Sequence, residues 1–270
     1  MLSDSFPHDH AAPSVFQPEN LLREARRQRG LPAQDVPVIC VLDPDGDLVG
    51  HLRRHGATPC PGWACYHTEL FEFALHDGST AGIVGCAVGA PFAVLVAEQL
   101  FASGCRFLID ITSAGQIADL GEPPYVVLID SALRDEGTSA HYVAAAPVMQ
   151  APDPGLLDAV AGLLLEALPG GVTLHRGMSW TTDAPYRETQ AAIDHARSRG
   201  ALAVEMEAAA LYAFATRCHA AVACFALVTN TMGTQDGDFE KGEADGAITA
   251  LAIVEAAAAG FRSHESGKDA

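Results

Sequence analysis

The chain has 270 residues, of which 49% are apolar, enough for one α/β domain with a sizeable core. Its formal net charge is −18, so most of its surface repels nucleic-acid backbones. No apolar run reaches the roughly 20 residues of a membrane-spanning helix, and residues 1–17 lack the hydrophobic segment of a secretory signal. We therefore expect a cytoplasmic protein that binds neither nucleic acid nor membrane.

The cysteines and histidines do not predict a metal site. The seven cysteines are odd in number and form no C-x-x-C pair, which indicates free thiols in a reducing compartment. His51 and His55 have a spacing of four, but Arg53 and Arg54 lie between them in a stretch rich in glycine and proline. We expect no metal and no cofactor.

Helices and strands alternate along most of the chain. In chain order we expect a helix at 18–29, strands at 36–42, 66–75 and 80–86, a helix at 92–103, strands at 105–111 and 125–133, a helix at 156–168, a strand at 171–176, a helix at 186–199, a helix beginning at Glu205, a strand at 221–230 and a helix at 244–261. The segments 51–62 and 134–154 are expected to be irregular.

This alternation predicts a single three-layer α/β domain, with a central sheet and helices on both faces. The domain is expected over residues 36–263, after an N-terminal arm and helix at 1–35 and before a tail at 264–270. Ligands bind at the carboxyl ends of the strands in sheets of this kind. The loops at those ends are expected at 43–47, 87–91, 112–115, 180–187 and 230–233.

One segment, Val204–Tyr212, carries two carboxylates at the start of a helix. It has the sequence V-E-M-E-A-A-A-L-Y, in which Glu205 and Glu207 flank Met206 before a run of strong helix formers. Acidic residues at a helix N-terminus are favoured by the helix dipole, so a structural role is one interpretation. A ligand-binding role is the other.

Five segments together resemble the nucleoside phosphorylase superfamily, on its uridine phosphorylase side, over residues 36–261. They are 43–45 (G-D-P-x-R turn), 87–91 (G-x-G-x-P turn), 112–115 (G-[ST]-x-G loop), 134–138 (R-D-x-[GA] segment) and 204–207 (the E-M-E signature). The resemblance implies a mixed, partly barrel-like sheet flanked by helices. It also implies a homo-oligomer, built of dimers or a hexamer, that cleaves the N-glycosidic bond of a nucleoside.

The resemblance gives Glu207 the vicinal hydroxyls of the sugar and packs Met206 against the sugar ring. A carboxylate can accept two hydroxyl hydrogen bonds and can stabilise the positive charge that develops on the sugar. Glu205 is expected either to bind substrate or to hold the loop.

The resemblance places the base beside residues 180–187. Trp180 or Tyr186 could stack on the heterocycle, and Arg187 could bind a base carbonyl. The alternative is that Trp180 belongs to the core and Arg187 lies on a helix surface. Asn230 stands where purine-type members carry an aspartate that protonates the leaving base, so it can only hydrogen-bond.

The phosphate site departs from the family. Leu42 replaces a phosphate-binding glycine, Gly46 and Asp110 replace arginines, and Phe92 replaces a serine, while Ser113 and Gly115 keep the pattern. A carboxylate in place of a guanidinium costs roughly 4 kcal/mol at about 4 Å and an effective dielectric near 20.

The sequence therefore favours hydrolysis, with Asp43, Asp45 or Asp110 as the base that activates water. Two alternatives stay open: a uridine-type phosphorylase with a relocated phosphate site, and a non-catalytic nucleoside-binding homologue.

Overall fold

The structure, a computed structural model, describes residues 8–231, 241, 244 and 246–268, with only the backbone of Asn230 and Thr231. Its strands form one sheet that closes partly into a barrel, because β5 pairs with both β10 and β9. The closed part consists of β5 (Phe107–Gln116), β10 (Ala221–Thr231), β6 (Tyr125–Asp135), β8 (Leu174–Thr182) and β9 (Ala201–Glu205).

The rest of the sheet extends from β5 as an open wing. Its strands follow in the order β1 (Ile39–Asp43), β4 (Thr80–Gly85), β3 (Phe71–Ala74) and β2 (Thr58–Pro59), while β7 (Val148–Gln150) pairs with β6. Parallel and antiparallel pairs both occur: β1 is parallel to β4 and β5, and β3 is antiparallel to β4. The predicted mixed, partly barrel-like α/β fold is confirmed.

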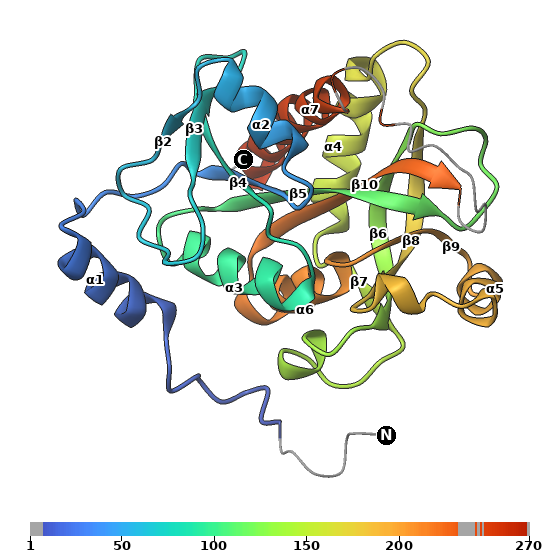
Figure 1. Ribbon diagram of the computed structural model, residues 1–270, viewed down its shortest axis with the longest axis horizontal. Helices are drawn as coiled ribbons and strands as arrows, with labels where there is room; N and C mark the ends of the chain where they lie inside the picture. Colours follow the sequence, from blue (N-terminus) through green and yellow to red (C-terminus); the bar gives the residue numbers. More distant parts are fainter. Residues whose placement is uncertain (1–7, 232–240, 242–243, 245, 269–270) are drawn as a thin grey trace.

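Helices cover both faces of the sheet (Figure 1). On one face α3 (Ala90–Phe101) packs with α6 (Ala208–Cys218), and on the other α4 (Pro154–Ala167) packs with α7 (Ala247–Lys268). The second pair is very close, since a Cβ at Gly260 would lie 2.9 Å from Val160 Cα. The remaining helical segments are α1 (Pro18–Arg29), α2 (Asp47–Arg54), α5 (Gln190–Ser198), η1 (Ser139–His141) and η2 (Pro185–Arg187).

The central strands are buried along their whole length. All five residues of β1 and nine of the ten in β5 are buried, so these strands show no alternation of apolar and polar positions. Parallel strands with helices on both faces read as continuous apolar runs for this reason. Polar side chains near their carboxyl ends are therefore forced into a largely dry environment.

Several predicted boundaries are wrong near the strand ends. The segment 112–115, expected as a loop, lies inside β5, and β8 continues to Thr182 through an expected loop. An unexpected strand, β9, runs to Glu205, so α6 begins at Ala208 and not at Glu205. Pairing with neighbouring strands extends β5, β8 and β9 beyond their apolar cores.

The stretch after β1 is also more ordered than expected. Residues Asp47–Arg54 form α2, with Leu48, Val49 and Leu52 buried. Asp43 Oδ2 accepts a hydrogen bond of 2.7 Å from the Val49 amide and so satisfies one free donor at the helix start.

The expected terminal regions are attached to the domain. The Arg217 guanidinium donates to the carbonyls of His10, Ala11 and Ala12, which holds the arm against the end of α6. At the other end α7 continues to Lys268, so residues 264–268 are helical where a tail was expected.

Candidate active site

Glu205 is fully engaged by the protein. Its Oε1 accepts hydrogen bonds from Ser179 Oγ at 2.9 Å and Thr181 Oγ1 at 2.5 Å. Its Oε2 accepts from the amides of Glu207 at 2.6 Å and Ala208 at 2.7 Å. The residue is 3% exposed, and it binds β8 to the start of α6. These contacts favour a structural role for Glu205, holding the loop, over the other role expected for it, binding substrate.

Glu207 is buried and joins two distant segments. Its Oε1 accepts a 2.7 Å hydrogen bond from the Gly89 amide, and its Oε2 accepts one of 3.1 Å from the Met206 amide. Burial, followed by the nearby charge of Glu205, raises the pKa of Glu207 to about 8, and the hydrogen bonds from the Gly89 and Met206 amides oppose this shift. Whether the Glu207 carboxyl is charged therefore depends on its burial and on the groups around it.

The loop that meets Glu207 requires its glycine. Gly89 has a φ of +88°, a backbone conformation that residues with a side chain rarely adopt. A Cβ at this position would lie 3.9 Å from Met206 Cε, so Met206 borders the same loop. The structure thereby brings the glycine-rich turn and the E-M-E segment together, as the resemblance implies.

Asp110 is a completely buried acid in the middle of β5. Neither of its carboxyl oxygens has a hydrogen-bond partner among the described residues. Burial raises the pKa of Asp110 well above its usual range, and the charges of Glu207 and Glu205 raise it further. This environment favours the protonated, uncharged acid.

Asp45 accepts hydrogen bonds from both the amide and the hydroxyl of Ser113. Asp45 Oδ2 accepts a 2.7 Å hydrogen bond from the Ser113 amide and a second, short one from the Ser113 hydroxyl. These residues line a cavity of about 20 Å³ together with Asp43, Thr112 and other residues of the loops around it. Such a volume holds about one water molecule.

The predicted base segment divides into core and surface. Trp180 is 4% exposed and packs in a hydrophobic cluster with Leu133 and Val204, so it acts as a core residue and not as an exposed stacking platform. Tyr186 is 99% exposed in η2, and Arg187 beside it is exposed as well. These two residues remain available to a ligand.

Asn230 and Glu188 are two further polar residues near the predicted site. Asn230 pairs through its backbone with Gly115, and its side chain lies outside the described part of the structure. Glu188 directly follows η2, and burial raises its pKa to about 7.

Sequence reasoning missed the hydroxyl groups that organise the site. Thr181 Oγ1 donates to Glu205 and also accepts a 3.0 Å hydrogen bond from the Ala209 amide, so it caps α6. Ser179 was missed in the same way. Only the knowledge that β8 extends to these two residues could have placed their hydroxyls beside Glu205.

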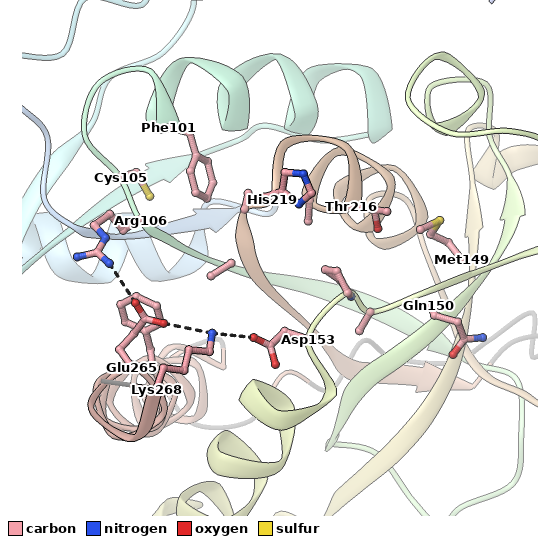
Figure 2. Close-up of a pocket in the computed structure, with 16 residues that line it drawn as sticks. Phe101, Cys105, Arg106, Met149, Gln150, Asp153, Thr216, His219, Glu265 and Lys268 are labelled. Carbon is pink, nitrogen blue, oxygen red and sulfur yellow. Dashed lines mark hydrogen bonds and ion pairs between the residues drawn. The ribbon is translucent and has the colours of Figure 1, made fainter. Parts of the chain in front are cut away.

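A separate cavity of about 770 Å³ lies at the other end of the strands, near the first residue of β10 (Figure 2). One wall is a chain of ion pairs from Arg106 to Glu265 at 3.0 Å, Glu265 to Lys268 at 3.3 Å, and Lys268 to Asp153 at 3.2 Å. No residue predicted to bind substrate lines it. The candidate chemistry is thus confined to the carboxyl ends of the strands.

The described residues contain no group of three or more histidine, cysteine, aspartate or glutamate side chains placed to hold a metal ion. His51 and His55 do share one side of α2 and its end, with ring centroids 4.2 Å apart, contrary to the irregular stretch expected there. Within the same part of the chain, every helix is too short or too polar to cross a bilayer.

Comparison with known proteins agrees with this geometry. The family model described as Phosphorylase superfamily matches residues 38–259. This chain belongs to the phosphorylase superfamily. Within the superfamily, it is 28% identical over 174 residues to a guanosine phosphorylase of Halorubrum lacusprofundi, covering 64% of this chain and 68% of that protein.

A second superfamily relative, a uridine phosphorylase of Thermococcus kodakarensis, is 28% identical over 205 residues, or 68% of this chain and 70% of that protein. The crystal structure of a uridine phosphorylase from Vibrio fischeri superposes with a TM-score of 0.67 and 19% identity, covering 87% of this chain and 94% of that one. The structural likeness establishes the shared fold. The predicted membership of the superfamily is confirmed.

Proposed function

We propose that this protein is a nucleoside phosphorylase, which cleaves the N-glycosidic bond of a uridine- or guanosine-type nucleoside with inorganic phosphate. The observation that carries the proposal is the buried carboxyl of Glu207, tied to Gly89 and bordered by Met206. The likeness to a guanosine phosphorylase and a uridine phosphorylase supports phosphorolysis.

In the proposed reaction a phosphate oxygen attacks C1′ of the sugar as the bond from C1′ to the base nitrogen breaks. The electron pair of that bond leaves with the base, which takes up a proton, and the products are the free base and the sugar 1-phosphate. Positive charge develops on the sugar in between. A carboxylate at Glu207 would stabilise this charge and accept the sugar hydroxyls.

Asp110 repels phosphate less than its place in the sequence indicates. A negative charge at Asp110 would repel phosphate and so favour hydrolysis. Burial favours the uncharged acid, so that repulsion is largely removed. The comparisons give the preference for hydrolysis no support, and the alternative of a phosphorylase fits them better.

Hydrolysis is the second candidate. The amide of Ser113 already donates a hydrogen bond to Asp45, and the adjoining cavity has room for about one water molecule. In that reaction Asp43 or Asp45 would take a proton from water, and the products would be free sugar and free base. Glu207 keeps the same role in both reactions.

The experiment that tests the proposed function measures base release from uridine, guanosine and their 2′-deoxy and 3′-deoxy counterparts. If Glu207 binds the vicinal hydroxyls, loss of one hydroxyl lowers kcat/KM by roughly tenfold or more, since a hydrogen bond to a charged group contributes about 1.5–3 kcal/mol. Absence of base release from all of these nucleosides would contradict the proposed function.

We also propose that the protein is a homo-oligomer, built of dimers or a hexamer. Val88, next to the Gly89 loop, is 51% exposed, and Leu95 on α3 is 39% exposed, so apolar side chains remain available to a second copy near the site. Sedimentation at micromolar concentration checks this, and a strict monomer would contradict it.

A further inference from the structure

The cavity beside Ser113 contains groups suited to an anion. Ser113 directs both its amide and its hydroxyl at one carboxylate oxygen of Asp45. Lys241 lines the same cavity, and its Nζ lies 2.5 Å from Asp47 Oδ2. Two donors and one cation therefore meet here. The donors are occupied by Asp45, from the loop after β1, and the cation by Asp47, the first residue of α2.

The start of α7 also favours a bound anion in this cavity. Gly246, Ala247 and Ala250, at the start of the 22-residue helix, line the cavity. The N-terminus of a helix carries a partial positive charge and favours a bound anion. Thr112, which precedes Ser113 in β5, also lines the cavity.

We propose that Ser113 and Lys241 form the phosphate site of this protein, and that Asp45 and Asp47 occupy it as internal substitutes until phosphate displaces them. This inference rests on the proposed function, since it places the nucleophile of that reaction. Lys241 supplies the positive charge that the predicted arginine positions, now Gly46 and Asp110, lack.

The two carboxylates are able to move away. Asp45 is an exposed residue, and the Asp47 side chain is 34% exposed, so both can rotate into solvent. The present cavity of about 20 Å³ is too small for phosphate, so displacement of both carboxylates is required to make room. Asp43 also lines the cavity, but its carboxylate is directed at the Val49 amide and stays in place.

The test measures binding of inorganic phosphate by titration calorimetry, without nucleoside. Asp45→Ala releases Ser113 and removes a negative charge, so we expect phosphate affinity to rise about tenfold or more. Lys241→Met should lower it by a similar factor. Asp158→Ala on α4 and Lys268→Met at the far end of α7 remove the same charges away from the cavity and should leave the affinity unchanged.

A double variant separates local contact from general charge. In the Ser113→Ala background, Asp45→Ala should give a much smaller gain, because the hydroxyl that it would release is absent. Thermal unfolding of each variant confirms that it is folded. The inference is overturned if neither wild type nor Asp45→Ala binds phosphate, or if Lys241→Met binds it as well as wild type does.

Phosphate binding is measured here independently of nucleoside cleavage. Phosphate binding that responds to Lys241 and Asp45, with no nucleoside cleaved, would uphold the anion site and reject the proposed function. Nucleoside cleavage by a protein whose phosphate binding is unaffected by these variants would uphold the proposed function and reject this anion site.

Discussion

The Gly89 amide donates a 2.7 Å hydrogen bond to Glu207 Oε1 across a separation of 118 residues. This contact fixes the glycine-rich turn before α3 against the start of α6. The second carboxyl oxygen of Glu207 accepts a hydrogen bond from the Met206 amide, so both oxygens are positioned by the backbone. The site is therefore assembled by backbone donors, and a substrate would meet a carboxyl whose position is already set.

Replacing Glu207 by glutamine should reduce catalysis while the fold is retained. Glutamine has nearly the same shape and can still accept from Gly89, but it cannot ionise, so it cannot supply the negative charge that stabilises positive charge on the sugar. We expect kcat/KM for the nucleoside to fall by roughly 10- to 100-fold, the equivalent of about 1.5–3 kcal/mol. Glu166→Gln, on the exposed side of α4, is the matched control and should leave kcat/KM as it is.

Replacing Glu205 by alanine should instead destabilise the protein. The carboxylate accepts four hydrogen bonds from Ser179, Thr181, Glu207 and Ala208, and its removal leaves these buried donors unsatisfied. We expect the free energy of unfolding to fall by about 2–4 kcal/mol, since each buried unsatisfied group costs about 1–3 kcal/mol. Urea unfolding measures this, and an unchanged midpoint would show that Glu205 does not hold the loop.

The buried acids predict how stability depends on pH. Burial raises the pKa of Asp43 to about 6, and burial with the charge of Glu205 raises that of Glu207 to about 8. Both groups titrate near pH 4 in the unfolded chain. In between, the folded state binds more protons, so the free energy of unfolding falls as pH rises. This contribution is complete below about pH 4 and is lost as pH rises through the two folded values.

Glu207→Gln should therefore lose less stability than wild type between about pH 4 and about pH 8, as measured by urea unfolding. Glu166→Gln again serves as the control and should follow the wild-type curve. Identical curves for wild type and Glu207→Gln would mean that Glu207 titrates normally in the folded protein.

Trp180 and Tyr186 should respond differently to substitution. Trp180 is buried, so Trp180→Ala should cost about 3–5 kcal/mol of stability. Tyr186 is exposed, so Tyr186→Ala should leave thermal unfolding unchanged and raise KM if the ring stacks on the base, whereas Tyr186→Phe keeps the ring and should restore KM. An unaltered KM in Tyr186→Ala would remove Tyr186 from the base site.

The sequence predicts the architecture better than the details of the site. Glycines and apolar runs locate α1 at its observed bounds and place α3 and α4 within two residues. The extended ends of β5, β8 and β9 could not be read, because pairing with distant strands holds their polar residues in the sheet. Ser113 is thus a strand residue, although its small neighbours indicate a loop.

The charge at Asp110 could not be predicted for a related reason. An aspartate in the sequence implies a negative charge, but β5 carries this one into a fully buried position between β1 and β10. Whether an acid is charged depends on burial and on its neighbours, and both are properties of the fold. Lys241 was overlooked similarly, since only the folded chain brings it to Ser113.

The most direct test of the proposed function is nucleoside cleavage with and without inorganic phosphate, in which sugar 1-phosphate and free sugar are both quantified. We predict that base release from uridine or guanosine requires phosphate and yields one sugar 1-phosphate for each base released. Base release at an equal rate without phosphate, with free sugar as the product, would contradict phosphorolysis and identify water as the nucleophile.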